Sequence, residues 1–347
     1  MKNLRGMTYE DILQEVTALG AKPYRAEQIF TWIYKRGITG IDAMTDVSKV
    51  FRELLKEGFF IGAVDVAAVR RSPDGTVKLA TRLEDGLLIE SVLIPDADRL
   101  TLCVSSQAGC ALGCKFCATG MNGFIRNLTL GELTGQVFAA QGLLEEGARI
   151  TNAVMMGMGE PLLNYDNVIH FTGILTDARG FGLSHNKVTI STAGIIPGIE
   201  RMAREAGVNL AVSINAATDE VRGRIMPVNN KYPLAGLVGA LRAYPLTGRK
   251  VITIEYVLLK NVNDSTRDAE GLIKLLKGIT CKINIIPLNP FPGARFSRPD
   301  DKAVEQFANI LRNAGLTALV RFSKGADVQG ACGQLAGECP SASHSAC

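Results

Sequence analysis

Short apolar stretches alternate with helical patterns along this 347-residue chain from residue 101 onward. Consecutive strands that are separated by helices run in parallel, with the helices as crossovers, so the alternation indicates an α/β fold. The expected strands are Thr101–Val104, Ala153–Met156, Lys187–Ser191, Asn209–Ile214, Ile252–Val257, Ile283–Ile286 and Ala318–Arg321. The helical patterns include Leu130–Glu145, Tyr165–Asp177, Pro233–Tyr244 and Lys302–Ala314. About six such units predict a partial (β/α)6-type barrel, whose chemistry gathers at the carboxyl ends of the strands.

Two smaller units are predicted before the barrel. Apolar residues at helical spacing in Tyr9–Leu19, Arg25–Lys35 and Ser48–Glu57 indicate a helical accessory domain over residues 1–72. Val77–Arg82 and Leu87–Ile94 flank the turn signal Glu-Asp-Gly, which predicts a β-hairpin extension over residues 73–95. The barrel core then covers residues 96–326.

The last segment, residues 327–347, ends in a tail without apolar periodicity, which we expect to be flexible. Cys339, His344 and Cys347 in this tail have a loosely zinc-like spacing. Exposed thiols are the simpler interpretation.

Bulk properties indicate a globular protein of the cytoplasm. No apolar run reaches the roughly 18 residues that a membrane span needs, and the first ten residues lack a secretory pattern. In a reducing compartment the eight cysteines serve as ligands or catalysts rather than as disulfides. A net charge of +4 is too small to identify a partner.

Three cysteines, Cys110, Cys114 and Cys117, form a C-x3-C-x2-C loop directly after the first expected barrel strand. Structural zinc usually takes four ligands, and no fourth Cys or His follows nearby. An iron–sulfur cluster with three cysteine-held irons and one open iron fits this set better. The loop therefore predicts such a cluster, with zinc or a redox role as the alternative.

The cysteine loop, with Phe116 before its last cysteine, resembles the radical S-adenosylmethionine (SAM) superfamily. The sequence Met-Gly-Met-Gly-Glu-Pro over residues 156–161 is similar to the Gly-Gly-Glu-Pro motif of that superfamily. Glycines there let the backbone approach a ligand closely. Taken alone, the motif is also compatible with an ordinary strand–turn–helix junction.

A narrower resemblance is to the RlmN/Cfr-type RNA adenine methyltransferases, and it runs in order along most of the chain. The segments that carry it are Ile89–Pro95, Cys103–Gln107, the cysteine loop, Ile190–Gly194, Ile225–Asn229, Pro287–Phe291 and Ala331–Leu335. The resemblance implies one [4Fe-4S] cluster and SAM as cofactors. It also implies 23S rRNA as substrate, and tRNA as a possible second one, methylated on a carbon of an adenine ring.

Adenine C2 and C8 are electron-poor carbons that do not attack a sulfonium methyl group, so a radical route is required. The resemblance implies that Cys332 carries a methyl group from one SAM, while a second SAM is cleaved to a radical that activates that group. Cys103 would then resolve the intermediate through a transient disulfide, and Glu90 would accept the ring proton. From the sequence alone, Cys332 could instead be a small core residue, Cys103 a buried strand cysteine, and Glu90 a surface carboxylate.

For the SAM pocket the resemblance points to residues that follow the expected strands. They are Gly159, Glu160, Ser191, Ser213, Ile214, Asn215 and Asn289. Each is also compatible with a turn or cap. Residues that bind the RNA phosphates are harder to predict, because basic residues near the barrel mouth are more often solvated surface charges. Candidates for such contacts are Arg126, Arg222, Arg224, Lys231, Arg295, Arg298, Arg321 and Lys324.

The leading hypothesis is a monomeric enzyme that methylates adenine C2 and draws electrons from a donor such as flavodoxin, without membrane contact. The helical domain would either contact RNA or serve only for packing. The enzymatic alternative is C8 methylation of the same rRNA adenine, as in related antibiotic-resistance enzymes. The alternative of another class is a non-catalytic iron–sulfur RNA-binding protein, which would not need Cys103 and Cys332.

Overall fold

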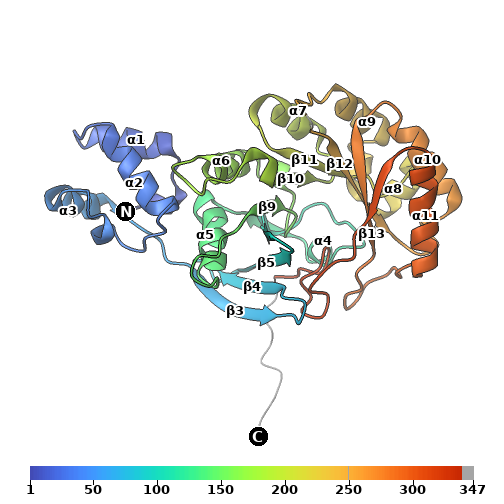
Figure 1. Cartoon of the computed structure of the whole chain (residues 1–347), viewed down its shortest axis with the longest axis horizontal. Coiled ribbons are helices and arrows are strands. Elements are labelled where there is room, and N and C mark those ends of the chain that lie inside the picture. Colours follow the sequence, from blue (N-terminus) through green and yellow to red (C-terminus); the bar gives the residue numbers. More distant parts are fainter. Residues whose placement is uncertain (249, 338–347) are drawn as a thin grey trace, which may run out of the picture.

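A computed structural model describes residues 1–248 and 250–337 and gathers ten strands into one open sheet (Figure 1). The order across the sheet is β14-β13-β12-β11-β10-β9-β6-β5-β4-β3. The predicted tail site at Cys339, His344 and Cys347 lies outside the described residues. In this part of the chain no helix is long and apolar enough to cross a membrane.

Seven of these strands form the parallel part of the sheet, and adjacent strands within that part pair in parallel. They are β6 (Arg99–Cys103), β9 (Asn152–Met155), β10 (Val188–Thr192), β11 (Asn209–Ser213), β12 (Ile252–Leu258), β13 (Cys281–Pro287) and β14 (Thr317–Val320). All seven predicted strands are therefore confirmed, with ends shifted by a few residues. Their inward residues, such as Ile190, Val212 and Ile254, are completely buried, as parallel strands between helices require.

The crossover helices include all four that the apolar pattern predicted. The longer helices of this part are α5 (Leu130–Gln141), α6 (Tyr165–Thr176), α7 (Ile196–Glu205), α9 (Leu234–Ala243), α10 (Thr266–Leu276) and α11 (Asp301–Asn313). Two short ones, α4 (Ala118–Met121) and α8 (Asp219–Ile225), lie beside the candidate site. Thr129 begins α5 with a reciprocal capping box to Glu132, which satisfies two backbone N–H groups at the helix start.

The predicted hairpin is present but is not a separate extension. β4 (Val77–Arg82) and β5 (Leu88–Asp96) pair antiparallel, and β5 also pairs with β6, so the hairpin continues the main sheet. A third strand, β3 (Asp65–Arg71), lies within the region predicted to be helical through residue 72. Its residues are mostly half-buried or exposed at the sheet edge, so they lack the apolar alternation that reveals a strand.

The three predicted N-terminal helices are confirmed and lie at one end of the molecule in Figure 1. They are α1 (Tyr9–Ala18), α2 (Tyr24–Tyr34) and α3 (Lys49–Gly58), and two short parallel strands, β1 (Lys2–Asn3) and β2 (Phe59–Phe60), complete the unit. The Arg5 guanidinium lies 4.3 Å from the ring centre of Phe138 on α5. Thr134, also on α5, donates a hydrogen bond of 2.9 Å to the Arg5 carbonyl. These contacts attach the helical unit to the sheet through one crossover helix.

Replacing Tyr34 with Phe is expected to weaken the N-terminal helical unit itself. The Tyr34 hydroxyl is buried and lies 2.7 Å from the Met7 carbonyl and 2.9 Å from the Arg5 carbonyl, so the change leaves buried acceptors unsatisfied. We expect the free energy of unfolding to fall by about 1–3 kcal/mol in urea denaturation. Tyr24→Phe, at a half-exposed ring on the same helix, is the matched control. Equal effects of the two changes would contradict this account.

Candidate active site

The cysteine loop is held at its base by a short antiparallel pair, β7 (Gln107–Gly109) and β8 (Phe124–Asn127). Gly109 has a φ of +76°, and a Cβ there would lie 2.0 Å from the carbonyl oxygen of Gly123. The backbone N–H of Cys110 donates a hydrogen bond of 2.7 Å to the same carbonyl. Only glycine permits this close approach, so the sequence fixes where the loop begins.

Within the loop the chain folds back on itself, because a Cβ at Gly120 would lie 2.9 Å from the backbone N and O atoms of Cys114. The thiols of Cys110, Cys114 and Cys117 all border one pocket. Burial raises the pKa of Cys110 to about 12 and also raises the pKa values of Cys114 and Cys117, so the three groups are neutral thiols here. No three His, Cys, Asp or Glu side chains of the described residues are grouped closely enough to hold a metal ion.

The same pocket is bordered by the carboxyl ends of five adjacent strands, β9 to β13. Neighbouring strands lie about 4.8 Å apart, so five strands in a flat sheet would span about 19 Å. The sheet must therefore curve around the pocket for all five strand ends to border it. Six of the seven residues predicted for the SAM site border this pocket: Gly159, Glu160, Ser191, Ser213, Asn215 and Asn289. Ile214 does not, because its side chain is buried in the core.

Glu160 is a buried carboxylate whose two oxygens join neighbouring elements. One oxygen accepts a hydrogen bond of 3.0 Å from Leu162 N, and the other accepts one of 2.7 Å from Ala193 N after β10. Burial raises the pKa of Glu160 to about 7, although these hydrogen bonds oppose the shift. The side chain therefore shapes the pocket wall between β9 and β10 in this arrangement.

Two asparagines of the predicted set are also bound to the protein itself. Asn215 accepts a hydrogen bond of 2.7 Å from Val257 N, which ties β11 to β12. Asn289 donates hydrogen bonds to the hydroxyl of Ser323, at 2.9 Å, and to the carbonyl of Cys332, at 3.1 Å. Asn289 therefore positions the Cys332 backbone at the pocket.

The segment that carries Cys332 packs against Cys103 through Leu335, although the two cysteines are 229 positions apart in the sequence. Cys332 borders the pocket and is accessible from it, so the interpretation as a core residue is wrong. Cys103 is buried at the end of β6, in a small apolar cluster with Val92, Met158 and Leu335. Burial raises the pKa of Cys103, and the charge of a Cys332 thiolate would add to that rise.

Glu90 is buried, so the surface-carboxylate interpretation is wrong. On the neighbouring strand β4, Lys78 lies diagonally across from it on the same face, and the Lys78 ammonium is 2.7 Å from one Glu90 oxygen. The other oxygen accepts a hydrogen bond of 2.9 Å from Ala336 N, and Lys78 donates to the Gln329 carbonyl at 3.1 Å. The ion pair therefore holds both ends of the segment that carries Cys332.

Sequence reasoning missed two charged residues of this region, Lys78 and Glu255. Glu255 borders the pocket from β12 and accepts a hydrogen bond of 2.9 Å from Asn284, its partner on β13. Each is a charge inside a strand with apolar neighbours, and that pattern could have marked both residues. Arg222, considered for phosphate contacts, is completely buried and cannot reach a phosphate on the surface.

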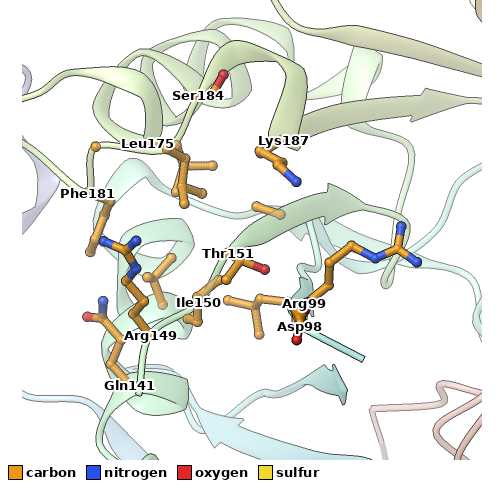
Figure 2. Close-up of a pocket in the computed structure, with 15 residues that line it drawn as sticks. Asp98, Arg99, Gln141, Arg149, Ile150, Thr151, Leu175, Phe181, Ser184 and Lys187 are labelled. Atoms are coloured by element: carbon orange, nitrogen blue, oxygen red, sulfur yellow. The ribbon is translucent and has the colours of Figure 1, made fainter. Parts of the chain in front are cut away.

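A second pocket lies at the opposite end of the parallel strands (Figure 2). Arg99 at the start of β6, Thr151 just before β9 and Lys187 just before β10 border it. None of the residues predicted for the site lies there. Since the chemistry of such folds gathers at the carboxyl ends of the strands, the cysteine pocket is the candidate active site.

Comparison with known proteins matches both parts of the chain. Residues 2–61 match the ribosomal RNA large subunit methyltransferase N-terminal domain, and residues 104–273 match the radical SAM superfamily. The dual-specificity RNA methyltransferase RlmN of Rhodospirillum rubrum is 48% identical over 341 residues, which cover 96% of this chain and 80% of the relative. The protein of the same name from Syntrophus aciditrophicus is 47% identical and covers 97% of each chain.

Structural comparison agrees. The crystal structure of a radical SAM methyltransferase from Sphaerobacter thermophilus superposes with a TM-score of 0.91 at 43% sequence identity. The superposition covers 97% of this chain and 100% of the other. The shared fold therefore extends over the accessory helices, the sheet and the Cys332 segment alike.

Replacing Glu255 with Gln is expected to change how stability depends on pH. Burial raises the Glu255 pKa to about 7 from 4.5, while Asn284, Arg321 and Lys282 oppose the rise. Between these two pH values the folded state binds a proton that the unfolded state releases, so the free energy of unfolding falls as pH rises. In the wild type this decline should amount to up to about 3 kcal/mol, and the Glu255→Gln variant should not show it. Urea denaturation of the cofactor-free protein from pH 4.5 to 7.5 measures it, and parallel profiles would contradict the assignment.

Proposed function

Because this chain belongs to the RlmN family of dual-specificity RNA methyltransferases within the radical SAM superfamily, we propose that it methylates adenine C2 in two RNAs. The substrates are a specific adenine of 23S rRNA and an adenine beside the tRNA anticodon. The name of its relatives, which states two specificities, supports two substrates. The observation that carries the proposal is the position of Cys332, which opens onto the pocket bordered by the three loop cysteines.

The residues present fit a [4Fe-4S] cluster with SAM. Cys110, Cys114 and Cys117 supply three thiol donors on one wall of the pocket, and the described residues offer no fourth thiol on that loop. Gly159, Ser191 and Ser213 at the strand ends would hold SAM. When bound, the cluster supplies an electron that splits SAM into a carbon radical able to remove hydrogen from a methyl group.

The chain's own sulfurs do the remaining work. Cys332 would carry the methyl group, because its thiol is accessible from the pocket while Asn289 holds its backbone. Desolvation inside the pocket, and then the charge of Glu255, raise the pKa of Cys332 to about 11, so this thiol must lose its proton before it accepts a methyl group. After hydrogen is removed from the S-methyl group, its carbon would add to the adenine carbon and link the RNA to Cys332, and the adduct would then lose one electron and the ring proton. Cys103, as a thiolate, would attack the Cys332 sulfur: the S–S bond forms, the sulfur–methylene bond breaks, and the methylene carbon takes a proton to become the methyl group of the released RNA. A reductant must supply two electrons to reopen that disulfide.

Glu90 would accept the proton of the ring carbon, which requires one of its oxygens to become free. In the structure one oxygen is paired with Lys78 and the other with Ala336 N. Release of the Ala336 hydrogen bond frees the second oxygen and leaves the ion pair intact. We expect the segment around Ala336 to move when RNA enters.

The remaining parts have supporting roles in this proposal. The helical unit at the N-terminus would contact the RNA, which its match to an rRNA methyltransferase domain supports. The parallel strands would act as a partial (β/α)6-type barrel, and an external donor such as flavodoxin would deliver the electrons.

The proposed reaction predicts methylation by protein reconstituted anaerobically with iron and sulfide. With SAM and reductant it should yield 2-methyladenosine in digests of 23S rRNA, measured by mass spectrometry. Cys332→Ala should lower the yield at least 1,000-fold, on the order of a lost covalent catalyst, and leave the cluster spectrum unchanged. Cys281→Ala, at a half-buried free thiol on β13 that does not border the pocket, is the control. A product of 8-methyladenosine, or turnover without Cys332, would reject the proposal.

A second prediction separates the chemical role of Glu90 from its structural one. Glu90→Gln leaves the buried Lys78 charge unpaired and should cost about 3–5 kcal/mol of unfolding free energy. The double change Glu90→Gln with Lys78→Met removes both charges and should recover most of that stability, measured by urea denaturation. RNA methylation should stay absent in the double variant, because no base remains. Methylation by the stable double variant would exclude Glu90 as the proton acceptor.

A further inference from the structure

Arg222 on α8 is a completely buried cation whose contacts are all with neutral oxygens. Its Nε donates to the Ile214 carbonyl at 3.0 Å, and its other nitrogens donate to four more oxygens. These acceptors are Asn229 Oδ1 at 3.0 Å, Tyr232 O at 3.3 Å, Ala193 O at 2.6 Å and Ser213 O at 3.2 Å. The N–H groups of the guanidinium therefore have hydrogen-bond acceptors, but none of these acceptors carries a negative charge.

Within residues 1–248 and 250–337 no carboxylate lies within ion-pair distance of Arg222. Asp219, on the same helix, accepts a hydrogen bond from Leu234 N instead. Lys78, the other buried cation beside the site, is paired with Glu90. Buried charges are normally paired, so an anion beside Arg222 would be stabilised by its guanidinium.

The place where that anion belongs follows from the geometry. The carbonyls that Arg222 binds at Ala193 and Ser213 belong to residues that border the pocket at the ends of β10 and β11. The cysteine loop contacts the same helix, because Lys115 N donates a hydrogen bond of 3.0 Å to the Ile225 carbonyl. Arg222 therefore lies behind the pocket wall that carries Cys114. Burial lowers the pKa of Arg222 to about 10, and the charges of a Cys114 thiolate and, less strongly, of Asp219 oppose that shift.

We propose that Arg222 is the counter-charge of the thiolate-bound iron–sulfur cluster and makes that cluster easier to reduce. Three thiolates give the bound cluster a net negative charge, and reduction adds another. A fixed cation in a region of low dielectric stabilises the reduced form more than the oxidised form. Arg222 acts through the cluster, so it is a positioning residue. This inference rests on the cluster of the proposed function, but not on RNA methylation.

The experiment compares the reduction potential of the cluster in reconstituted, SAM-free holoprotein, by anaerobic redox titration followed by electron paramagnetic resonance. Arg222→Gln removes the charge and keeps an amide donor, and should lower the equilibrium constant for reduction at least tenfold, which is about 59 mV. Arg222→Lys keeps the charge and should restore most of the potential. Arg5→Gln is the matched control, because Arg5 is also buried against carbonyls, those of Gly62 and Ile38, but lies in the N-terminal unit. It should leave the potential unchanged.

An unchanged potential in Arg222→Gln, or an equal fall in Arg222→Lys, would overturn the proposal. Thermal unfolding of the cluster-free proteins gives a second, independent reading. Cluster-free Arg222→Gln should still fold but should unfold at a lower temperature than the wild type, because Gln leaves buried carbonyl acceptors without a donor. Failure to fold would assign Arg222 to holding the fold and would also overturn the proposal. A wild-type protein that binds iron and sulfide but does not methylate RNA would reject the proposed function and leave this comparison valid.

Discussion

The arrangement of the site depends on how the backbone of residues 331–336 is held after the last strand of the sheet. Asn289 binds the Cys332 carbonyl, Ala118 N donates to the Gly333 carbonyl at 2.8 Å, and Ala336 N donates to Glu90. These partners come from the β13 loop, the cysteine loop helix and β5. A short segment without regular structure thereby joins three parts of the fold, and the position of the Cys332 sulfur follows from hydrogen bonds to its neighbours rather than from its own conformational preference.

Charge at the site follows a consistent logic. Lys78 and Glu90 are both buried and paired, so neither is free to attract a ligand. Glu160 and Glu255 have pKa values raised to about 7 by burial, which weakens their negative charge near neutral pH. The loop thiols are neutral for the same reason. The pocket wall is therefore poor in anions until the three loop thiols lose their protons, as thiolate ligands of a cluster must.

The sequence predicted the elements that depend on the local pattern of apolar residues. It did not predict the features that depend on how neighbouring strands are paired. The seven parallel strands were predictable because each is a short apolar run between helical patterns. β3 was not, since an edge strand such as Asp65–Arg71 needs no apolar alternation. The Lys78–Glu90 pair was equally hidden, because the sequence of one strand does not show which residue of its neighbour lies on the same face. Only the pairing of Ala80 with Glu90 places Lys78 on the same face.

The open edges of the sheet explain why Cys332 can serve the pocket at all. β14 and β6 end the parallel part, and no described strand pairs β14 with the antiparallel edge. The chain crosses back instead as a segment in which Lys324 donates to the Pro95 carbonyl and Gly325 N donates to Asp74. A closing strand would bind its backbone along a full ladder and turn alternate side chains away. A segment held by single hydrogen bonds keeps Cys332 facing the pocket and can release Ala336 from Glu90 without disturbing the sheet, since stability in a fold is local.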